Sequence, residues 1–472
     1  MAELAPVIVW FRRDLRTQDH AALVAAVATG RPVVSLFIYD PLTEDIGAAP
    51  KFRLSLSIAQ LASDLEALGS RLILRRGPAL AVLREVIAEM GASGVFWSRL
   101  YDPASKARDI AVKAALQGDG LDVRSFQGHV LFEPWSVETK TGGFYRVFTP
   151  MWKSVRAREL PACLPAPKAL RPPAKWPRSD NLGAWHMDSP MARGAQVLRP
   201  YCVVGQGAAL ARLDTFIAER VENYQANRDL PAVDGTSRLS ENLTYGEISP
   251  LTCWHAGWGA LHAGASQAEV FLKELVWREF AYHLAHHTPR IIDQNWKPDW
   301  DGFDWNEADT PEVVAWKQGR TGIPFVDAAM REMYVTGTMH NRGRMIVASY
   351  LTKHLLTHWK VGQAWFADCL TDWDPASNAM GWQWSAGSGP DATPYFRVFN
   401  PVSQLEKFDK GHVYADRWIA ENRLMPSATA LSYFDAIPLR WGLSAGDPYP
   451  APVMTVDLGR KRALDAYAQR GF

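Results

Sequence analysis

Cysteine is scarce in this sequence, with four residues among 472 and no CxxC spacing. Thiols scattered in this way fit neither a disulfide framework nor a zinc or iron–sulfur site. The chain is therefore not expected to depend on covalent cross-links or on a thiolate-bound metal. We expect the four cysteines to be buried and chemically inert; they are Cys163, Cys202, Cys253 and Cys369.

Long apolar runs are also absent, although hydrophobic residues make up 47% of the sequence. No stretch approaches the roughly 20 residues that a membrane-spanning helix needs. The first residues, Met1–Trp10, lack a basic segment followed by an apolar run and a small-residue cleavage site, so nothing indicates secretion. We expect a globular cytoplasmic protein with two or three packed domains, because one core rarely organises so long a chain.

Net charge is low as well, at +1. Affinity for phosphates depends on local positive charge, so the balance excludes a protein that binds nucleic acid over its whole surface. Any nucleic-acid site must be a local patch. Tryptophan, in contrast, is abundant at 20 residues; many of these rings belong in a core, but their number favours stacking or redox roles.

The first 130 residues alternate short β-branched runs with amphipathic helical segments, which predicts an α/β domain with a doubly wound parallel sheet. No glycine follows the first run at Phe11–Arg16, so the turn that cradles a pyrophosphate in dinucleotide-binding folds is missing. The expected strands are Val7–Trp10, Val33–Tyr39, Leu72–Arg75, Gly94–Trp97 and Val123–Phe126, and the expected helices are Ala21–Ala28, Phe52–Leu68, Ala79–Met90 and Ala104–Leu116.

Six prolines between Pro161 and Pro177 prevent regular helix and predict a long connector. After Gly205 strand patterns fade and helical ones dominate. We therefore divide the chain into an α/β domain at 1–132, a connector at 133–204 and a mostly α-helical domain at 205–472. The expected helices of the last part are Ala208–Ala226, Val270–His287, Val326–Met333, Met339–Trp359 and Gln363–Leu370.

Two of these helices carry unusual faces. Glu274, Trp277 and Arg278 are spaced to share one side of their helix. Asn341, with Arg344 and Met345, mixes an amide, a cation and a soft apolar group in the same way. An amphipathic helix with a surface ion pair would explain the first set alone, but the second is an odd face for core packing.

Acidic residues follow in a predicted short loop that contains Asp372, Asp374 and Asn378. A solvated acidic loop is the simple interpretation. The alternative is a buried carboxylate paired with Arg344, whose guanidinium suits such a partner. Just beyond, Trp382 and Trp384 point the same way if extended and to different faces if helical, which the sequence leaves open.

A turn after Gly235 offers hydroxyls, a cation and free backbone N–H groups, which suit a phosphate. An ordinary helix N-cap explains such a stretch equally well. Three nearby histidines have no carboxylate or thiol at ligand spacing, so we expect no metal site. The turn comprises Thr236, Ser237, Arg238, Leu239 and Ser240, and the histidines are His283, His286 and His287.

Several segments together resemble the photolyase/cryptochrome family. The similarity spans nearly the whole chain in the family's order, and the Leu100–Pro103 segment (LYDP) resembles plant cryptochromes and so favours class III photolyases. The segments are WFRRDLR from Trp10, GTSRLS from Gly235, ELVWREF from Glu274, MHNRGRM from Met339, GWQW from Gly381 and PYFRVFNPVSQLEK from Pro394.

The resemblance implies an antenna chromophore, 5,10-methenyltetrahydrofolate by family habit, in the α/β domain, and a U-shaped FAD in the helical domain. Asn378 would face flavin N5, where photolyases keep an amide. Phe271 and Thr338 depart from the tryptophans that many members have, which puts packing around the adenine in question. The FAD-binding residues implied are Tyr224, Thr236, Ser237, Arg238, Leu239, Ser240, Arg278, Arg344, Asp372, Asp374 and Asn378.

The resemblance further implies light-driven repair of cyclobutane pyrimidine dimers in UV-damaged DNA by a monomeric lyase. An oxidisable tryptophan chain would comprise Trp382, Trp359 and Trp305, with three ordinary core tryptophans as the alternative. A blue-light photoreceptor without repair activity is the rival function, and an NAD(P)H-dependent flavoprotein lacks a second dinucleotide site. The lesion and DNA contacts implied are Glu274, Trp277, Asn341, Arg342, Met345, Trp384, Arg397, Gln404 and Lys407.

Overall fold

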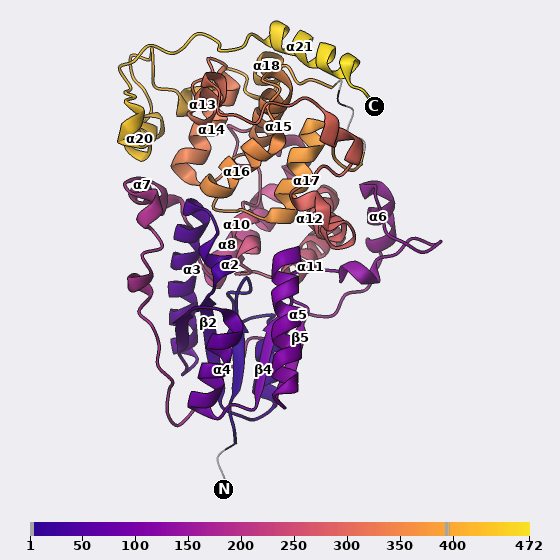
Figure 1. The fold of residues 1–472 in the computed structure, drawn as a ribbon, viewed down its shortest axis with the longest axis vertical. Coiled ribbons are helices and arrows are strands. Elements are labelled where there is room, and N and C mark those ends of the chain that lie inside the picture. The colour runs from indigo at the N-terminus through magenta and orange to yellow at the C-terminus, as the bar shows by residue number, and fades with distance from the viewer. Residues whose placement is uncertain (1–3, 392–394, 396) are drawn as a thin grey trace.

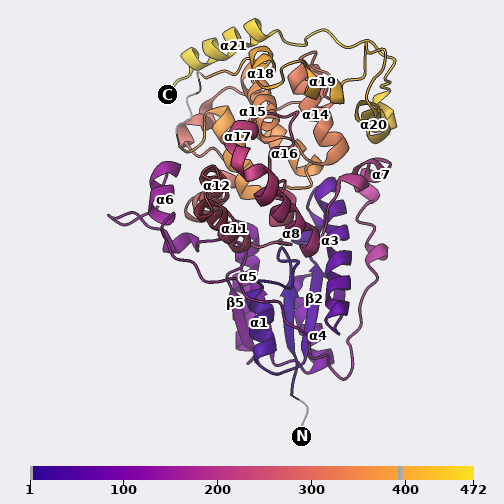
Figure 2. The same cartoon turned by 180° about the vertical axis from the view of Figure 1, so that it is seen from behind.

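A computed structural model describes residues 4–391, 395 and 397–472. The α/β part lies at one end of an elongated molecule and the helical part at the other (Figure 1). The connector runs back along the α/β part before the chain enters the helical one (Figures 1 and 2). Within the described ranges no helix is long and apolar enough to cross a membrane.

The sheet of the α/β part is fully parallel and has the order β3-β2-β1-β4-β5, which confirms the predicted fold class. Alternate residues of β1 (Val7–Phe11) enter two separate cores: Val9 packs on the side of α1 and α3, and Trp10 on the side of α4 and α5. The other elements are β2 (Val33–Tyr39), β3 (Leu72–Arg76), β4 (Gly94–Ser98), β5 (Asp122–Phe126), α1 (Ala21–Ala28), α2 (Pro41–Glu44), α3 (Ala48–Ala67), α4 (Ala79–Met90) and α5 (Pro103–Gly118).

The connector is held by backbone hydrogen bonds along the α/β part. Val33 N donates to Arg171 O, and Leu170 N donates to Leu68 O. It contains the short helices α6 (Phe148–Val155) and α7 (Gly194–Leu198). The predicted domain limits at 132 and 204 stay predictions, since the connector packs against both parts of the molecule.

The helical part begins with α8, and two of the helices expected in it need correction. The described helices are α8 (Gln206–Thr215), α9 (Tyr224–Asn227), α10 (Ser240–Thr244), α11 (Pro250–His262), α12 (Ala268–His287), α13 (Pro311–Lys317), α14 (Pro324–Thr336), α15 (Asn341–Ser349), α16 (Trp359–Cys369), α17 (Pro375–Ala386), α18 (Pro401–Phe408), α19 (Val413–Trp418), α20 (Ala428–Ala436) and α21 (Val456–Gln469).

The predicted single helix Met339–Trp359 is wrong. α15 passes into a π-helical turn at Tyr350–His354, and Leu356 then adopts a positive φ of 48°. Trp359 begins the next helix, capped by the side chain of His358. The predicted helix 208–226 is likewise broken by π- and 3₁₀-helical turns after α8. Neither break contains proline or glycine, so the sequence carries no local signal for it.

The expected burial of all four cysteines is correct only for Cys253. Cys163, Cys202 and Cys369 are half-buried, because each lies where a helix or loop meets the connector or the surface. Burial nevertheless raises the pKa of Cys202 and of Cys253 to about 12. Both thiols are therefore protonated at neutral pH and poor nucleophiles.

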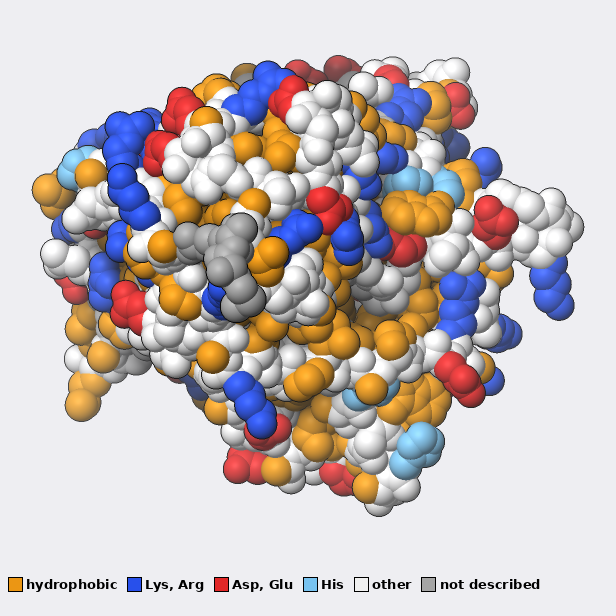
Figure 3. Space-filling view, turned by 90° about the horizontal axis from the view of Figure 1, so that it is seen from below, with side chains coloured by type: hydrophobic (Ala, Val, Ile, Leu, Met, Phe, Trp, Pro, Cys, Tyr) orange, Lys and Arg blue, Asp and Glu red, His pale blue; other side chains and the backbone are white. Residues whose placement is uncertain are grey.

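Charged side chains of both signs are interspersed on the end of the molecule formed by the α/β part (Figure 3). This mixture agrees with the net charge of +1. The end formed by the α/β part is thus not a broad basic surface that would attract phosphates.

A buried lysine gives a pH-dependent stability prediction. Lys353 is 3% exposed, and burial lowers its pKa to about 7, while its ammonium donates to the carbonyl of Arg397. The unfolded chain therefore binds more protons than the folded chain above pH 7, so stability rises with pH in that window by up to about 1.4 kcal/mol per pH unit.

Lys353→Met should remove this slope. Denaturant titrations between about pH 7 and 9 should show a rising free energy of unfolding for the native chain and a flatter one for the variant. Equal slopes in the two proteins would show that Lys353 is charged in the folded state.

Candidate flavin and DNA site

The face predicted on α12 exists and opens toward α9 and the connector. Glu274 accepts a short charge-assisted hydrogen bond from Arg228, whose guanidinium lies over the ring of Tyr224. Trp277 stacks on Phe148 of α6, with 3.7 Å between ring centroids and 4° between planes. An ion pair and a fixed indole thus line one wall, and both are half-buried and open to a ligand.

The neighbouring wall comes from the first two turns of α15. Asn341 is exposed, and its amide nitrogen lies 4.0 Å from the sulfur of Met345. Arg342 pairs with Asp229 at 2.7 Å and lies 4.3 Å above the ring of Phe408. The amide and the thioether share a face as predicted, and Arg342 points to the side of α18.

Arg344 and Asp372 form the predicted pair, with 2.7 Å between Nη2 and Oδ2. Asp372 Oδ1 is buried and meets no hydrogen-bond partner in the described part of the chain. A buried carboxylate oxygen without a partner is costly, so this atom indicates a place for a ligand donor. The simple interpretation, a solvated acidic loop, is wrong for Asp372.

Asp374 caps α17, accepting from Ser377 N at 2.8 Å, and Asn378 lies on the second turn of that helix rather than in the predicted short loop. Proline at the first helical position explains this early start, which the loop prediction overlooked. The amide nitrogen of Asn378 donates to Asp374 O at 3.0 Å. Its amide oxygen is therefore the group left to face a ligand.

A buried polar chain joins α12 to Asp374. Arg278 contacts His129 at 3.1 Å, His129 contacts the hydroxyl of Tyr282 at 2.8 Å, and Tyr282 donates to Asp374. Arg13 of the α/β part lies 3.7 Å from the same carboxylate. Desolvation opposes ionisation of Asp374, but Arg13 and Arg278 outweigh it and lower its pKa. Asp374 is thus a fixed negative charge.

The segment after Gly235 leads into α10, and Arg238 has a φ of 53° there. Arg238 pairs with Asp234 at 2.8 Å on the surface. Ser240 is exposed, whereas the side chain of Leu239 packs in the core, so only its backbone could meet a ligand. Tyr224 also belongs to that core, beside Phe271.

α17 settles the question of the two tryptophans. Because the segment is helical, Trp382 and Trp384 lie on different faces, the first buried and the second half-buried. Trp382 packs on Gly362 of α16 so closely that a Cβ there would lie 2.1 Å from the ring. Trp305 and Trp359 both contact the ring of His358, at 5.0 and 5.4 Å. All three rings of the predicted chain are buried.

The remaining predicted contacts lie around α18. Lys407 lies 4.9 Å above the ring of Phe408, which Arg342 flanks from the other segment. Gln404 has a buried amide oxygen without a partner among the residues described. Arg397 is exposed, while Pro394 and Phe396 of the same motif lie outside the described residues. Arg342, Arg397 and Lys407 are the cations of this patch at α18, and Arg342 is already paired with Asp229.

A separate cavity of about 220 Å³ lies where the carboxyl ends of β1 and β2 meet the helical part. Parallel sheets bind ligands at this edge. Its walls combine cations, carboxylate and apolar groups, among them Arg12, Arg13, Phe37, Asp102, Arg108 and Trp373.

The histidines on α12 are used in packing. Tyr145 N donates to His283 at 3.0 Å, and His287 stacks on Phe144 with centroids 4.8 Å apart. Within the described ranges, no group of three histidine, cysteine, aspartate or glutamate side chains could hold a metal ion.

The site residues fit a flavin. Arg344 and Asp372 offer a donor and an unpaired buried acceptor, Asn378 offers an amide oxygen, and the segment before α10 offers hydroxyls and N–H groups. Such a donor set suits the ring edge and the phosphates of a dinucleotide. Sequence reasoning missed Arg228, Phe148, Tyr282 and His129, which are joined to predicted residues only through the fold.

Comparison with known proteins defines the class. Residues 7–172 match the family model of DNA photolyase, and residues 271–469 match that of the FAD binding domain of DNA photolyase. The chain belongs to the photolyase/cryptochrome family, as the sequence motifs predict, and contains its FAD-binding domain.

Individual relatives show which members of the family the chain is similar to. The chain is 45% identical to a deoxyribodipyrimidine photo-lyase of Agrobacterium fabrum over 98% of both chains. It resembles the crystal structure of a class III photolyase from Agrobacterium tumefaciens with a TM-score of 0.91 and 44% identity, covering 99% and 98% of the two chains. A Synechocystis cryptochrome is similar at a TM-score of 0.85 and 26% identity, covering 99% and 100%.

Proposed function

We propose that this protein is a deoxyribodipyrimidine photo-lyase that repairs cyclobutane pyrimidine dimers in DNA with light. The observation that carries the proposal is the double use of α15. Arg344 pairs with Asp372 on the flavin side, and Asn341 and Met345, which are assigned to the lesion, belong to the same short helix. We infer that ligands at the two sets would be neighbours, because both sets belong to one helix of nine residues.

FAD would be held by Arg344, Asp372 and the turn before α10, and would supply the electron that light excites. The amide oxygen of Asn378 can accept a hydrogen bond from an N–H group of the flavin. The amide supplies no acidic proton in return, because it does not ionise. Asn378 therefore favours repair over signalling. The presence of every residue expected to contact the lesion favours repair as well. The rival function, a photoreceptor, has no use for that second set.

The lesion wall suits an extruded pyrimidine pair. Trp277 is held flat by Phe148, so it can receive one unstacked face of the dimer with little loss of side-chain entropy. Met345 offers a soft, adaptable contact, and Trp384 a second ring. Glu274, once released from Arg228, can accept hydrogen bonds from the pyrimidine N–H groups; to donate one to a carbonyl, where negative charge develops, it must carry a proton.

DNA around the flipped pair would contact the patch at α18. Arg342 and Lys407 both lie over the ring of Phe408, and Arg397, shortly before α18 in the chain, is exposed. Cations at this place would position the phosphate backbone of the DNA. The amide oxygen of Gln404 has no partner among the described residues and could accept a further hydrogen bond. Arg228, which the sequence did not indicate, adds a further cation. It could leave Glu274 and bind a DNA phosphate instead.

Trp382, Trp359 and Trp305 are proposed as a relay that carries electrons inward to the flavin site. Indoles are oxidisable, and the buried rings span α17, α16 and the segment before α13. Trp359 and Trp305 both contact the ring of His358, which keeps the step between these two rings short.

The cavity at the carboxyl ends of β1 and β2 is our proposed place for an antenna chromophore, with 5,10-methenyltetrahydrofolate as the proposed pigment. Its 220 Å³ would hold a ring system, and the lining arginines Arg12, Arg13 and Arg108 are each already paired with an aspartate. The monomeric state and cytoplasmic location expected from the sequence also remain proposals.

The test of this function illuminates the chemically reduced protein with an oligonucleotide that contains one thymine dimer. We expect thymine absorbance to recover in light and not in the dark. Bound flavin without any repair, on single- and double-stranded substrates alike, would support the photoreceptor instead.

A further inference from the structure

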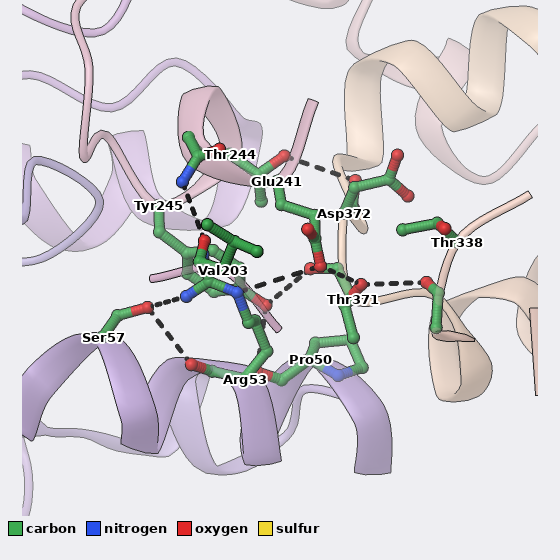
Figure 4. Close-up of polar contacts among 12 residues, drawn as sticks. Pro50, Arg53, Ser57, Val203, Glu241, Thr244, Tyr245, Thr338, Thr371 and Asp372 are labelled. Carbon is green, nitrogen blue, oxygen red and sulfur yellow. Dashed lines mark hydrogen bonds and ion pairs between the residues drawn. The ribbon is translucent and has the colours of Figure 1, made fainter. Parts of the chain in front are cut away.

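The loop that carries Asp372 is fixed from outside the flavin site. Thr371 donates its hydroxyl to Glu241 Oε1 at 2.6 Å and its N–H to Gly337 O at 2.7 Å. Tyr245 donates its hydroxyl to Thr371 O at 2.8 Å. Figure 4 shows these groups converging on Thr371, immediately before Asp372. The backbone at this point therefore has little freedom to move.

Gly337 allows this close approach. Its φ is +70°, and a Cβ at this position would lie 2.4 Å from the Thr371 methyl group. Thr244 adds a hydroxyl hydrogen bond to Asp372 O at 3.3 Å. The main chain at Thr371 and Asp372 is thus packed and hydrogen-bonded on both sides.

The opposite end of the network lies in the α/β part. Arg53 of α3 donates to both carboxylate oxygens of Glu247, at 3.0 and 2.8 Å, and its Nε lies 3.8 Å from Glu241 Oε1. The same guanidinium donates to Val203 O at 2.9 Å and to Ser57, and lies 5.1 Å from the ring of Tyr245. Figure 4 shows α3 reaching across to the segment that holds Glu241.

Burial makes this guanidinium hard to replace. Arg53 is 0% exposed, and its two carboxylate neighbours Glu241 and Glu247 are equally enclosed. A buried carboxylate that loses its cation is left uncompensated, which costs far more than an exposed pair would. Arg212, 3.4 Å from Glu241 Oε2, is a second cation beside Glu241. Glu241 and Asp372 carry like charge on either side of Thr371, so Arg53 also offsets their repulsion.

We propose that Arg53 is a positioning residue of the flavin site: through Glu241 and Thr371 it holds Asp372 in register with Arg344. The inference rests on the proposed flavin site. It gives the α/β part a second role, because the strand-and-helix domain fixes the flavin-facing carboxylate whether or not it carries an antenna pigment.

Thr371→Val tests the step closest to the flavin. Valine keeps the volume and removes the hydroxyl, which lies 2.6 Å from Glu241 Oε1 and 2.9 Å from Gly337 O, whereas Thr371→Ser keeps the hydroxyl. Loss of a hydrogen bond to a charged group should raise the FAD dissociation constant roughly tenfold in the valine variant and leave the serine variant near the native value. The resolved shoulders of the bound flavin absorption band should broaden only with valine.

Arg53→Lys tests the distant step, since lysine keeps the positive charge but loses both the two-pronged contact with Glu247 and the Nε group beside Glu241. Measured with Thr371→Val in a double-mutant cycle, its effect on FAD dissociation should be less than additive, because both changes act through Glu241. Arg75→Lys is the matched control: Arg75 is a buried arginine of the same domain paired with Glu89, and its replacement should leave FAD binding unchanged.

Two outcomes would overturn the inference, and they are distinguishable. If Arg344→Leu loses FAD but Thr371→Val binds it with native affinity and spectrum, Asp372 needs no anchoring and the positioning role fails alone. If Arg344→Leu also binds FAD normally, the flavin site itself is misplaced and the positioning role fails with it. Additive effects of Arg53→Lys and Thr371→Val would likewise contradict a shared route.

Discussion

Replacing Trp382 by phenylalanine should abolish light-driven reduction of the oxidised flavin while leaving repair by chemically reduced protein intact. Phenylalanine fills most of the space against Gly362 but is far harder to oxidise than indole. The first step from the flavin site outward would therefore be lost without disturbing the lesion wall. Photoreduction is followed by bleaching of the oxidised flavin band under blue light with an external reductant.

Trp254→Phe is the matched control, because Trp254 is equally buried but packs behind α12 against Phe132 and Trp152. It should photoreduce at the native rate. Unchanged photoreduction in the Trp382 variant would refute the relay and leave its three members as ordinary core tryptophans.

Trp277→Ala should have the second large effect, on recognition of the dimer. Base–aromatic stacking contributes about 1–3 kcal/mol per base, so removing the indole should weaken binding of dimer-containing DNA by roughly tenfold to a hundredfold. Affinity for undamaged DNA, which depends on the patch at α18, should change little. Fluorescence anisotropy of labelled oligonucleotides with and without a dimer measures both.

Trp258→Ala provides the control for this variant. Trp258 is a half-buried indole on α11 that contacts Trp254 and His262. Its removal should leave the preference for damaged DNA intact. If the native protein and the Trp277 variant prefer damaged over undamaged DNA to the same degree, Trp277 does not contact the lesion.

Sequence periodicity predicts the α/β part well because each of its elements is locally encoded. Alternate residues of β1 serve two cores, and β2 and α1 begin and end where the pattern does. The helical part is less predictable. The π-helical turn at Tyr350–His354 and the positive φ of Leu356 break a continuous helical pattern, and both are imposed by packing rather than by a breaking residue.

The candidate site shows the same limit. Motifs and helical spacing indicate Glu274, Trp277 and Arg344, and the fold gives each of them a partner. Their partners are invisible locally, since Phe148 and Arg228 reach the α12 face from far along the chain. Arg53 is further removed still: it lies in an ordinary amphipathic helix of the other domain, and nothing in its neighbourhood of sequence points to Glu241 or Glu247.

The central claim is that a flavin at Arg344, Asp372 and Asn378 lies close enough to a dimer at Trp277 and Glu274 to pass it an electron. The fluorescence lifetime of the excited, fully reduced flavin measures this contact most directly. Dimer-containing DNA should shorten the lifetime, and undamaged DNA of the same sequence should not. A lifetime that stays constant while damaged DNA is bound would contradict the account.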